Sequence, residues 1–303
     1  MTTELWLLRQ APVTIAAVVE DGTIIDIARR NDDRPTITGS QFIGKIIEKN
    51  TKLKALFVDL GLARPGFLSL TKTTKELTVG QRISVTCTSE LSDLKGPALR
   101  LDGALCDNEP KPSLTSDASD PVAALLERNS EVDNALCSDP ALVEALRLKL
   151  PIGVKISAFA KSEFVDNWRD ELSSFCDALD SFSWPLKEEQ GVALLFEPGQ
   201  TLTAIDVNSG AGAIRNEEER LQTNLNAAVA IVEQLKLRQL SGQIVVDFVG
   251  MERRESRQKV TAAVEQALSQ VPNRVSIVPL NSLDLLCLSI QRLYPPFHVS
   301  SQE

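Results

Sequence analysis

The chain has 303 residues, of which 43% are apolar and 24% charged, a balance typical of a globular protein with room for two or three small domains. No apolar run approaches the roughly 20 residues that cross a bilayer, and the opening MTTELWLLRQAPV lacks the pattern of a signal peptide. Five scattered cysteines without a CxxC pair argue against a disulfide framework and a zinc ribbon. We therefore expect a cytoplasmic protein that makes no contact with membranes.

The net charge of −9 argues against a nucleic-acid partner, because phosphate contacts favour basic proteins. The total does not exclude a local basic surface. An acidic protein can also act on a polyanion through a bound divalent cation, which supplies positive charge where it is needed. Any nucleic-acid function must therefore be argued from specific residues.

The first third of the chain favours β structure. Residues 1–38 alternate apolar and polar side chains, and Asp21-Gly22 between two β-branched runs predicts a hairpin turn. From Gly39 to about Leu105 several short strands follow without helices between them, which predicts a small β-barrel. The run DNEPKPSLTSDASD, residues 107–120, is nearly free of apolar residues and predicts a linker or exposed loop.

Helical periodicity begins after Pro121 in three short amphipathic segments. The last third then alternates predicted strands and helices: strand TLTAIDVNSG, helix 217–240, strand GQIVVDFVG, helix 255–270, strand RVSIVPL and helix 282–294. Strand–helix–strand order of this kind predicts an α/β unit with a parallel pair of strands.

Two aspartates stand out in that unit. Asp206 ends the strand TLTAIDVN, and Asp247 lies inside the apolar strand QIVVDFV. A right-handed crossover can bring these strands together, and two neighbouring carboxylates repel each other unless a cation lies between them. Oxygen ligands without nearby His or Cys suit magnesium, which can activate water for attack on a phosphodiester. Asn208 could orient a phosphate oxygen or a water.

A single Asp in a strand is more often a structural hydrogen-bond acceptor than a metal ligand. The spacing of Asp206 and Asp247 therefore leaves both interpretations open, and it does not name a substrate. The one histidine, His298, rules out a Ser-His-Asp or Cys-His site of the usual kind and is expected at the surface. The basic run 251–259 could meet RNA phosphate or could be a solvated helix face.

The runs TLTAIDVNSG and TNLNAAVAIVEQLKLRQLSGQIVVDFVGM resemble the catalytic segment of the ribonuclease E/G family. In that family the two aspartates of these motifs carry magnesium, which implies the same role for Asp206 and Asp247. The resemblance also implies that Asn208 supports catalysis. It further implies that Arg274, in NRVSIV, lies near the active site and contacts RNA.

The segment GKIIEKNTKLKALFVDLGLARPGFLSL resembles the family's ribosomal-protein-type OB-fold RNA-binding domain. The resemblance implies that Phe57, Phe67 and Lys95 contact the RNA strand, since aromatic faces stack on bases and lysine meets phosphate. Without the resemblance, both phenylalanines would be assigned to the core, where most Phe residues lie.

The resemblance implies an α+β and α/β multidomain fold, with an RNase H-like subdomain, an inserted OB-fold barrel and a deoxyribonuclease I-like catalytic subdomain. The implied parts are 1–38 and 125–190 for the RNase H-like subdomain, 39–106 for the barrel, 107–124 for a polar linker in place of the family's 5′ sensor, and 191–303 for the catalytic subdomain. The Arg-Thr motif of that sensor and the CPxCxG zinc-link are missing from this sequence. We therefore expect no zinc and no zinc-linked tetramer, but a monomer or weak dimer.

The function that these features imply is a magnesium-dependent endoribonuclease acting on single-stranded RNA in RNA processing or decay, including rRNA processing, with manganese as a second usable ion. The family's reaction leaves a 5′-phosphate and a 3′-hydroxyl. One alternative is a non-catalytic RNA-binding relative. Another is a metal-dependent phosphoesterase with a smaller substrate. The presence of Asp206, Asn208 and Asp247 favours the enzyme, and the barrel favours RNA.

Overall fold

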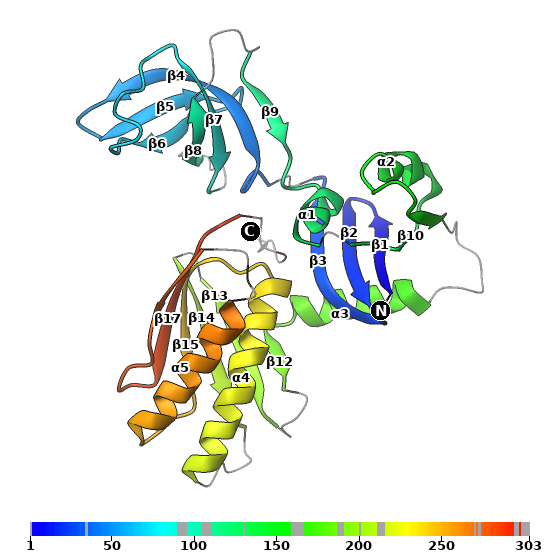
Figure 1. Cartoon of the computed structure of the whole chain (residues 1–303), viewed down its shortest axis with the longest axis vertical. Helices are drawn as coiled ribbons and strands as arrows, with labels where there is room; N and C mark the ends of the chain where they lie inside the picture. Colours follow the sequence, from blue (N-terminus) through cyan, green and yellow to red (C-terminus); the bar gives the residue numbers. More distant parts are fainter. Residues whose placement is uncertain are drawn as a thin grey trace.

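A computed structural model gives the fold of the chain (Figure 1). It describes residues 2–33, 36–89, 96–104, 111–129, 131–158, 167–186, 191–199, 201–210, 216–269, 271, 274–293 and 297. Within these residues no helix combines the length and the apolar character that a membrane span requires. The strands form three sheets, which we call the N-terminal sheet, the barrel and the C-terminal sheet.

The N-terminal sheet has five strands in the order β11-β10-β1-β2-β3. Its strands are β1 (Thr3–Gln10), β2 (Val13–Glu20), β3 (Thr23–Asn31), β10 (Asn134–Cys137) and β11 (Lys155–Ala158). The first three are antiparallel, whereas β10 and β11 run parallel to β1. The predicted β2–β3 hairpin is present, with φ of 46° at Asp21 and 80° at Gly22.

Helices cover both faces of the N-terminal sheet. The helices are α1 (Pro121–Arg128), a 3₁₀ turn (Pro140–Leu142), α2 (Val143–Arg147) and α3 (Asn167–Asp180). Leu125 and Leu146 pack on one face, and Trp168, Leu172 and Leu179 pack on the other. The sheet is therefore the central layer of three, and neither face is left open for a ligand.

The barrel consists of β4 (Gln41–Asn50), β5 (Ala55–Asp59), β6 (Gly66–Ser69), β7 (Arg82–Cys87) and β8 (Ala98–Ala104). The order β5-β6-β8-β7-β4 closes through an additional β4–β5 pairing. A further strand, β9 (Ser113–Ser116), pairs with β4, so part of the expected linker is regular structure. Residues 105–110 of that linker lie outside the described residues.

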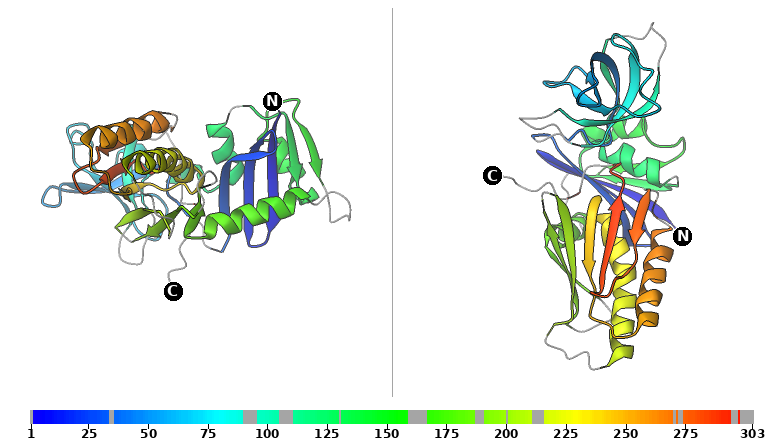
Figure 2. Two further views of the ribbon diagram at one scale, coloured as in Figure 1. Left: turned by 90° about the horizontal axis from the view of Figure 1, so that it is seen from below. Right: turned by 90° about the vertical axis from the view of Figure 1, so that its left-hand side faces the viewer.

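The C-terminal sheet has six strands in the order β12-β13-β14-β15-β17-β16. They are β12 (Ser183–Pro185), β13 (Ala193–Pro198), β14 (Leu202–Asn208), β15 (Gly242–Asp247), β16 (Val275–Val278) and β17 (Leu285–Ile290). The predicted parallel pair is β14–β15, joined by α4 (Glu217–Leu237). Helix α5 (Arg254–Leu268) lies beside α4 on the same face of the sheet (Figure 2).

The predicted helix over 282–294 is wrong, because Leu285–Ile290 forms β17. Its residues alternate between half-buried and buried, the period of a strand with one covered face. The segment pairs with β15 on one side and β16 on the other. This pairing stabilises a strand even though the spacing of the leucines in the sequence suggests a helix.

The barrel lies beyond one end of the C-terminal sheet, and the N-terminal sheet lies beside both (Figures 1 and 2). The N-terminal and C-terminal bodies are joined by one apolar cluster, in which Leu237 of α4 packs with Trp168 and Phe297. The Gln239 side chain also donates a hydrogen bond to the Ile27 carbonyl, at 2.7 Å. Strand β15 runs away from the barrel, so its last residue lies at the remote end of the sheet.

Candidate active site

Asp206 and Asp247 are direct neighbours across the central strands of the C-terminal sheet. Strands β14 and β15 are parallel, and their register pairs Asp206 with Asp247. Adjacent strands lie about 4.8 Å apart, and paired residues point to the same face. The fold thus brings the two predicted carboxylates together from positions 41 residues apart in the sequence.

Both carboxylates lie on the sheet face that the helices leave uncovered. Ile205, Val207 and Val246 alternate with them and are buried against α4 and α5, whereas Asp206 and Asp247 are exposed. We call this uncovered side the open face. Its residues on the central strands are Leu195, Glu197, Ala204, Asp206, Gln243, Val245, Asp247, Leu285, Cys287 and Ser289. Solvent and a ligand can therefore reach the pair directly.

The pair is an uncompensated negative site. Burial raises the pKa of Asp206 above its ordinary value, and the nearby carboxylates of Asp247 and Glu197 raise it further. Among the described residues, none forms a hydrogen bond or ion pair with the side chain of Asp206 or Asp247. Two adjacent carboxylates without a protein partner are suited to a cation.

The donor set limits which cation would fit. Within the described ranges, no group of three or more His, Cys, Asp or Glu side chains is arranged to hold a metal. A structural zinc site needs four protein ligands, whereas magnesium keeps several waters and needs only one or two carboxylates. Asp206 and Asp247 therefore fit magnesium or a similar hard cation.

Asn208 lies two residues beyond Asp206 on β14, so the strand period places both on the same face. Its Oδ1 accepts a hydrogen bond from the backbone N–H of Gly210, at 2.8 Å. This bond fixes the side chain at the end of the strand and leaves Nδ2 as its donor. An amide donor next to two carboxylates could contact a phosphate oxygen.

The loop that follows Asp247 is held by a residue that sequence analysis missed. Asn224 of α4 is fully buried. Its Nδ2 donates to the Val249 carbonyl at 2.8 Å, and its Oδ1 accepts from the Val249 N–H at 3.0 Å. This double contact fixes the chain just after the carboxylate. Asn is uncommon in helix interiors, and this is the signal that could have identified Asn224 from the sequence.

A second contact holds the start of α5. The carboxylate of Glu217 accepts hydrogen bonds from the backbone N–H groups of Glu252 and Arg253, each at 3.0 Å. These two bonds, with one from Ser256, lower the pKa of Glu217 to about 2. Arg253 also pairs with Glu218 at 3.1 Å, so part of the basic run 251–259 has a structural role.

The structure does not bring Arg274 to the pair. Arg274 directly precedes β16, whose first residue, Val275, pairs with Ile290. Ile290 in turn pairs with Gly242, five residues before Asp247. Five residues of strand span roughly 17 Å. Arg274 is therefore exposed at the opposite, barrel-proximal end of the sheet, because the antiparallel order of β16, β17 and β15 places it there.

The two predicted aromatic contacts on the barrel are adjacent. Phe57 on β5 pairs with Phe67 on β6, and their rings meet edge to face with centroids 6.1 Å apart. Phe67 is 36% exposed and Phe57 is half-buried, and neither belongs to the barrel core. Lys95 lies outside the described residues. Two neighbouring accessible rings form a surface on which bases can stack.

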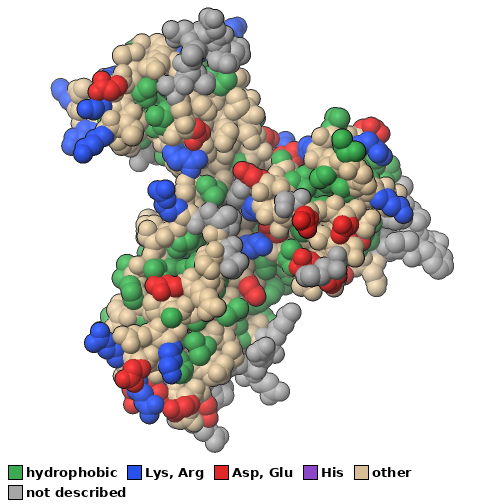
Figure 3. Space-filling model, in the orientation of Figure 1, with side chains coloured by type: hydrophobic (Ala, Val, Ile, Leu, Met, Phe, Trp, Pro, Cys, Tyr) green, Lys and Arg blue, Asp and Glu red, His purple; other side chains and the backbone are tan. Residues whose placement is uncertain are grey.

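The barrel segment also has a different charge from the rest of the chain. Residues 39–106 contain ten Lys and Arg against six Asp and Glu, while the whole chain contains 32 against 41. Lys and Arg side chains, drawn in blue, gather at the outer end of the barrel and between the barrel and the C-terminal sheet (Figure 3). The barrel segment therefore has a positive net charge although the net charge of the whole chain is negative.

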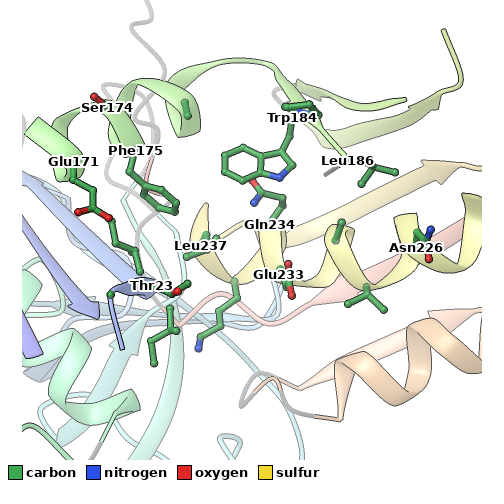
Figure 4. Close-up of a pocket in the computed structure, with 18 residues that line it drawn as sticks. Thr23, Glu171, Ser174, Phe175, Trp184, Leu186, Asn226, Glu233, Gln234 and Leu237 are labelled. Atoms are coloured by element: carbon green, nitrogen blue, oxygen red, sulfur yellow. The ribbon is translucent and has the colours of Figure 1, made fainter. Parts of the chain in front are cut away.

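A hollow of about 1080 Å³ lies away from the carboxylates, between α3, β12 and α4 (Figure 4). Phe175 and Trp184 form its aromatic wall, and Glu171 and Glu233 approach it from the two helices. Helix α4 covers the face of the sheet opposite to Asp206 and Asp247. The hollow is thus separated from the pair by the sheet itself.

The comparisons with known proteins concern the C-terminal part of the chain. Residues 179–293 match the model of the ribonuclease E/G family. The C-terminal part of this chain is therefore similar to the ribonuclease E/G family. The matched range contains all six strands of the C-terminal sheet, both helices and the carboxylate pair.

Individual relatives match over a similar length. The chain is 36% identical to Ribonuclease E of Escherichia coli over 124 residues, 40% of this chain and 12% of that protein. It is 32% identical to Ribonuclease G of the same species over 106 residues, 34% of this chain and 22% of that protein. Ribonuclease E of Nostoc is 39% identical over 104 residues, 34% and 15% of the two chains. The aligned part thus spans less than a quarter of each relative.

Proposed function

We propose that this protein is a magnesium-dependent endoribonuclease that cleaves single-stranded RNA, with manganese as a second usable ion. The observation that carries the proposal is the in-register pair Asp206–Asp247, exposed on an open face and without a partner among the described residues. The match of residues 179–293 to the ribonuclease E/G family supports a ribonuclease. The basic barrel with Phe57 and Phe67 supports an RNA substrate.

Each part of the fold has a role in this proposal. The closed barrel, with strand order β5-β6-β8-β7-β4, is an OB-fold domain of residues 39–106 that holds the RNA strand. The N-terminal sheet is the RNase H-like subdomain, built from 1–38 and 125–190, and 191–303 form the deoxyribonuclease I-like catalytic subdomain. Residues 107–124, which include β9 and the start of α1, would take the place of the family's 5′ sensor.

The chemistry follows from the residues at the carboxylate pair. Asp206 and Asp247 would hold the cation, and Asn208 would orient the phosphate through its amide. A divalent cation there supplies water activation and offsets the negative charge that develops on the phosphate. The raised pKa of Asp206 means that the carboxylate is protonated at a higher pH than usual, so cation binding would be lost at a higher pH than for an ordinary Asp.

The protein would work in the cytoplasm, in RNA processing or decay, as a monomer or weak dimer without zinc. The alternative is a non-catalytic relative that binds RNA without cutting it. That alternative would leave the open, unpaired carboxylates without a role. The cleavage experiment described next distinguishes the two.

The test is incubation of the protein with a 5′-labelled, unstructured RNA in magnesium and, separately, in EDTA. We expect internal cleavage in magnesium only, with products that carry a 5′-phosphate and a 3′-hydroxyl. Binding without cleavage under both conditions would favour the non-catalytic relative. Cleavage that persists in an Asp206→Asn, Asp247→Asn double variant would overturn the assignment of the site.

A further inference from the structure

The barrel-proximal end of the C-terminal sheet is in contact with the root of the barrel. Gly39 lies two residues before β4, and Leu293 lies three residues after β17. A Cβ on Gly39 would come within 1.8 Å of the Leu293 carbonyl oxygen, so the two backbones touch. The open face therefore begins at the barrel, and the carboxylate pair lies at its far end.

Two arginines are present at this junction. Arg274 is exposed just before β16. Arg292 is also exposed, and its Nη2 lies 3.1 Å from the position that a Cβ on Gly242 would occupy. Neither guanidinium forms an ion pair with a carboxylate of the described residues. Arg274 precedes Val275, which pairs with the buried Ile290, so Arg274 lies on the open face where a strand leaving the barrel would meet the sheet. Arg292 lies beside Gly242, on the side of the buried Ile244.

Between these arginines and the carboxylates the open face is uncharged along β15 and β17. Gln243 lies beside Ser289, and its Nε2 donates to Ser289 Oγ at 3.1 Å. Val245 lies beside Cys287 in the next row, and both are half-exposed. We call this surface, formed by Gln243, Val245, Cys287 and Ser289, the lane. Glu197 lies outside it on β13, beyond Ala204.

We propose that the lane is a binding site for the RNA segment between the barrel and the scissile phosphate. This inference rests on the proposed function. Arg274 meets a phosphate as the strand leaves the barrel, and bases lie on Val245 and Cys287. The path along β15 from Gly242 to Asp247 is roughly 17 Å long, and the lane forms its middle part. Stacked nucleotides advance about 3.4 Å each, so the whole path holds about five.

The charged groups at the two ends of the open face favour RNA as its ligand. One end has the exposed Arg274 next to a basic barrel, and the other has the carboxylates that would cut. Glu197 repels phosphate from the β13 side and so confines the strand to β15 and β17. A second copy of the chain on this apolar strip would instead cover Cys287 in the absence of RNA, and this is a separate outcome of the test.

The first test is chemical footprinting of Cys287 in the full chain. The protein is alkylated with iodoacetamide in EDTA, and each cysteine is quantified by peptide mass spectrometry. We expect an unstructured RNA of about 20 nucleotides, longer than the site of one barrel, to slow labelling of Cys287 severalfold. A trinucleotide should not. The buried cysteines Cys87, Cys137 and Cys176 provide the internal reference.

The second test changes the charge of the lane without touching the pair. Gln243→Glu should weaken binding of the same RNA by about threefold at low salt, the scale of an exposed charge contact, and Gln243→Lys should strengthen it. The control is Gln222→Glu on α4. Gln222 is also exposed, and its Nε2 also donates one side-chain hydrogen bond, to Asn226 at 3.0 Å, but it lies on the helix side.

The outcomes separate this inference from the proposed function. RNA that is cleaved in magnesium but neither protects Cys287 nor responds to charge at Gln243 would overturn the lane and leave the enzyme intact. Cys287 that becomes accessible only on dilution of the protein would identify a contact between copies and overturn the lane. RNA that does not bind at all would overturn both.

Discussion

The barrel and the C-terminal sheet differ in charge. The barrel segment has an excess of Lys and Arg and two neighbouring phenylalanines, whereas the open face of the sheet ends in two aspartates that have no partner among the described residues. A surface that only binds RNA does not need carboxylates, and carboxylates alone repel phosphate. Under the proposed function, the barrel would hold the RNA and the carboxylate pair would cut it, with a cation between the carboxylates and the phosphate.

The largest effect is expected when the carboxylate pair is removed, which should abolish RNA cleavage but not RNA binding. In the Asp206→Asn, Asp247→Asn variant we expect cleavage to fall by about a thousandfold or more, since a catalytic metal contributes several kcal/mol to the transition state. Binding of the labelled RNA should be unchanged or slightly tighter, because two negative charges are removed. Cleavage rates and fluorescence anisotropy on the same sample measure the two effects. Equal losses of both would contradict the separation.

The converse change concerns the barrel. Phe57→Ala with Phe67→Ala should weaken RNA binding by about tenfold to a hundredfold, because stacking contributes about 1–3 kcal/mol per base. Cleavage at saturating RNA should change little. The control is Phe182→Ala, which removes a ring that is 55% exposed outside the barrel. If the control weakens binding as much as the double variant, the barrel is not the holding surface.

A smaller effect is expected from the support behind Asp247. Asn224→Ala removes both hydrogen bonds to Val249 and leaves its buried N–H and carbonyl without these partners. We expect the free energy of unfolding to fall by about 2 kcal/mol, together with a reduced cleavage rate and unchanged RNA affinity. Urea unfolding and single-turnover cleavage provide the measurements. A weakened RNA affinity with normal cleavage would contradict the assignment of Asn224 as a support for Asp247.

The smallest effect is a shift in pH dependence. Asp206 must be ionised to hold a cation, and its raised pKa means that activity is lost as the pH falls through a higher value than for an ordinary Asp. Glu197→Gln removes one of the charges that raise this pKa. The acidic limb of the cleavage profile should therefore move to lower pH, with little change in the plateau. A limb that moves to higher pH would contradict the electrostatic account.

The same pKa has a consequence for stability. Because the folded-state pKa of Asp206 lies above its unfolded value, ionisation of this group disfavours the folded state. Its contribution to stability is present at low pH and is lost as the pH rises through the folded pKa. A cation bound to the ionised pair would reverse that loss, so magnesium should raise the melting temperature more at neutral than at acidic pH.

The sequence predicted much of the C-terminal sheet because its elements carry strong local patterns. The strands that contain Asp206 and Asp247 and the long helix between them are correct, and their parallel pairing follows from the handed crossover. The helix predicted over 282–294 is wrong because pairing on both sides of Leu285–Ile290 is a long-range effect. Local periodicity does not contain that information.

Other features depend on arrangement rather than on residue type. Which face of the sheet stays open is decided by the packing of α4 and α5, so the exposure of Asp206 and Asp247 could not be read from apolar runs. The position of Arg274 depends on the register of three strands. Asn224 lies in the run TNLNAAV, which resembles a family motif, but its contact with Val249 depends on the packing of α4 beside the end of β15.

The most direct test of the central claim is the binding of a cation to the carboxylate pair. Titration of the full chain with Mn²⁺, followed by electron paramagnetic resonance, should show one ion lost in Asp206→Asn and in Asp247→Asn. Asp170→Asn, which removes an exposed carboxylate on α3, should retain it. Identical Mn²⁺ binding in the wild type and in both site variants would contradict the account.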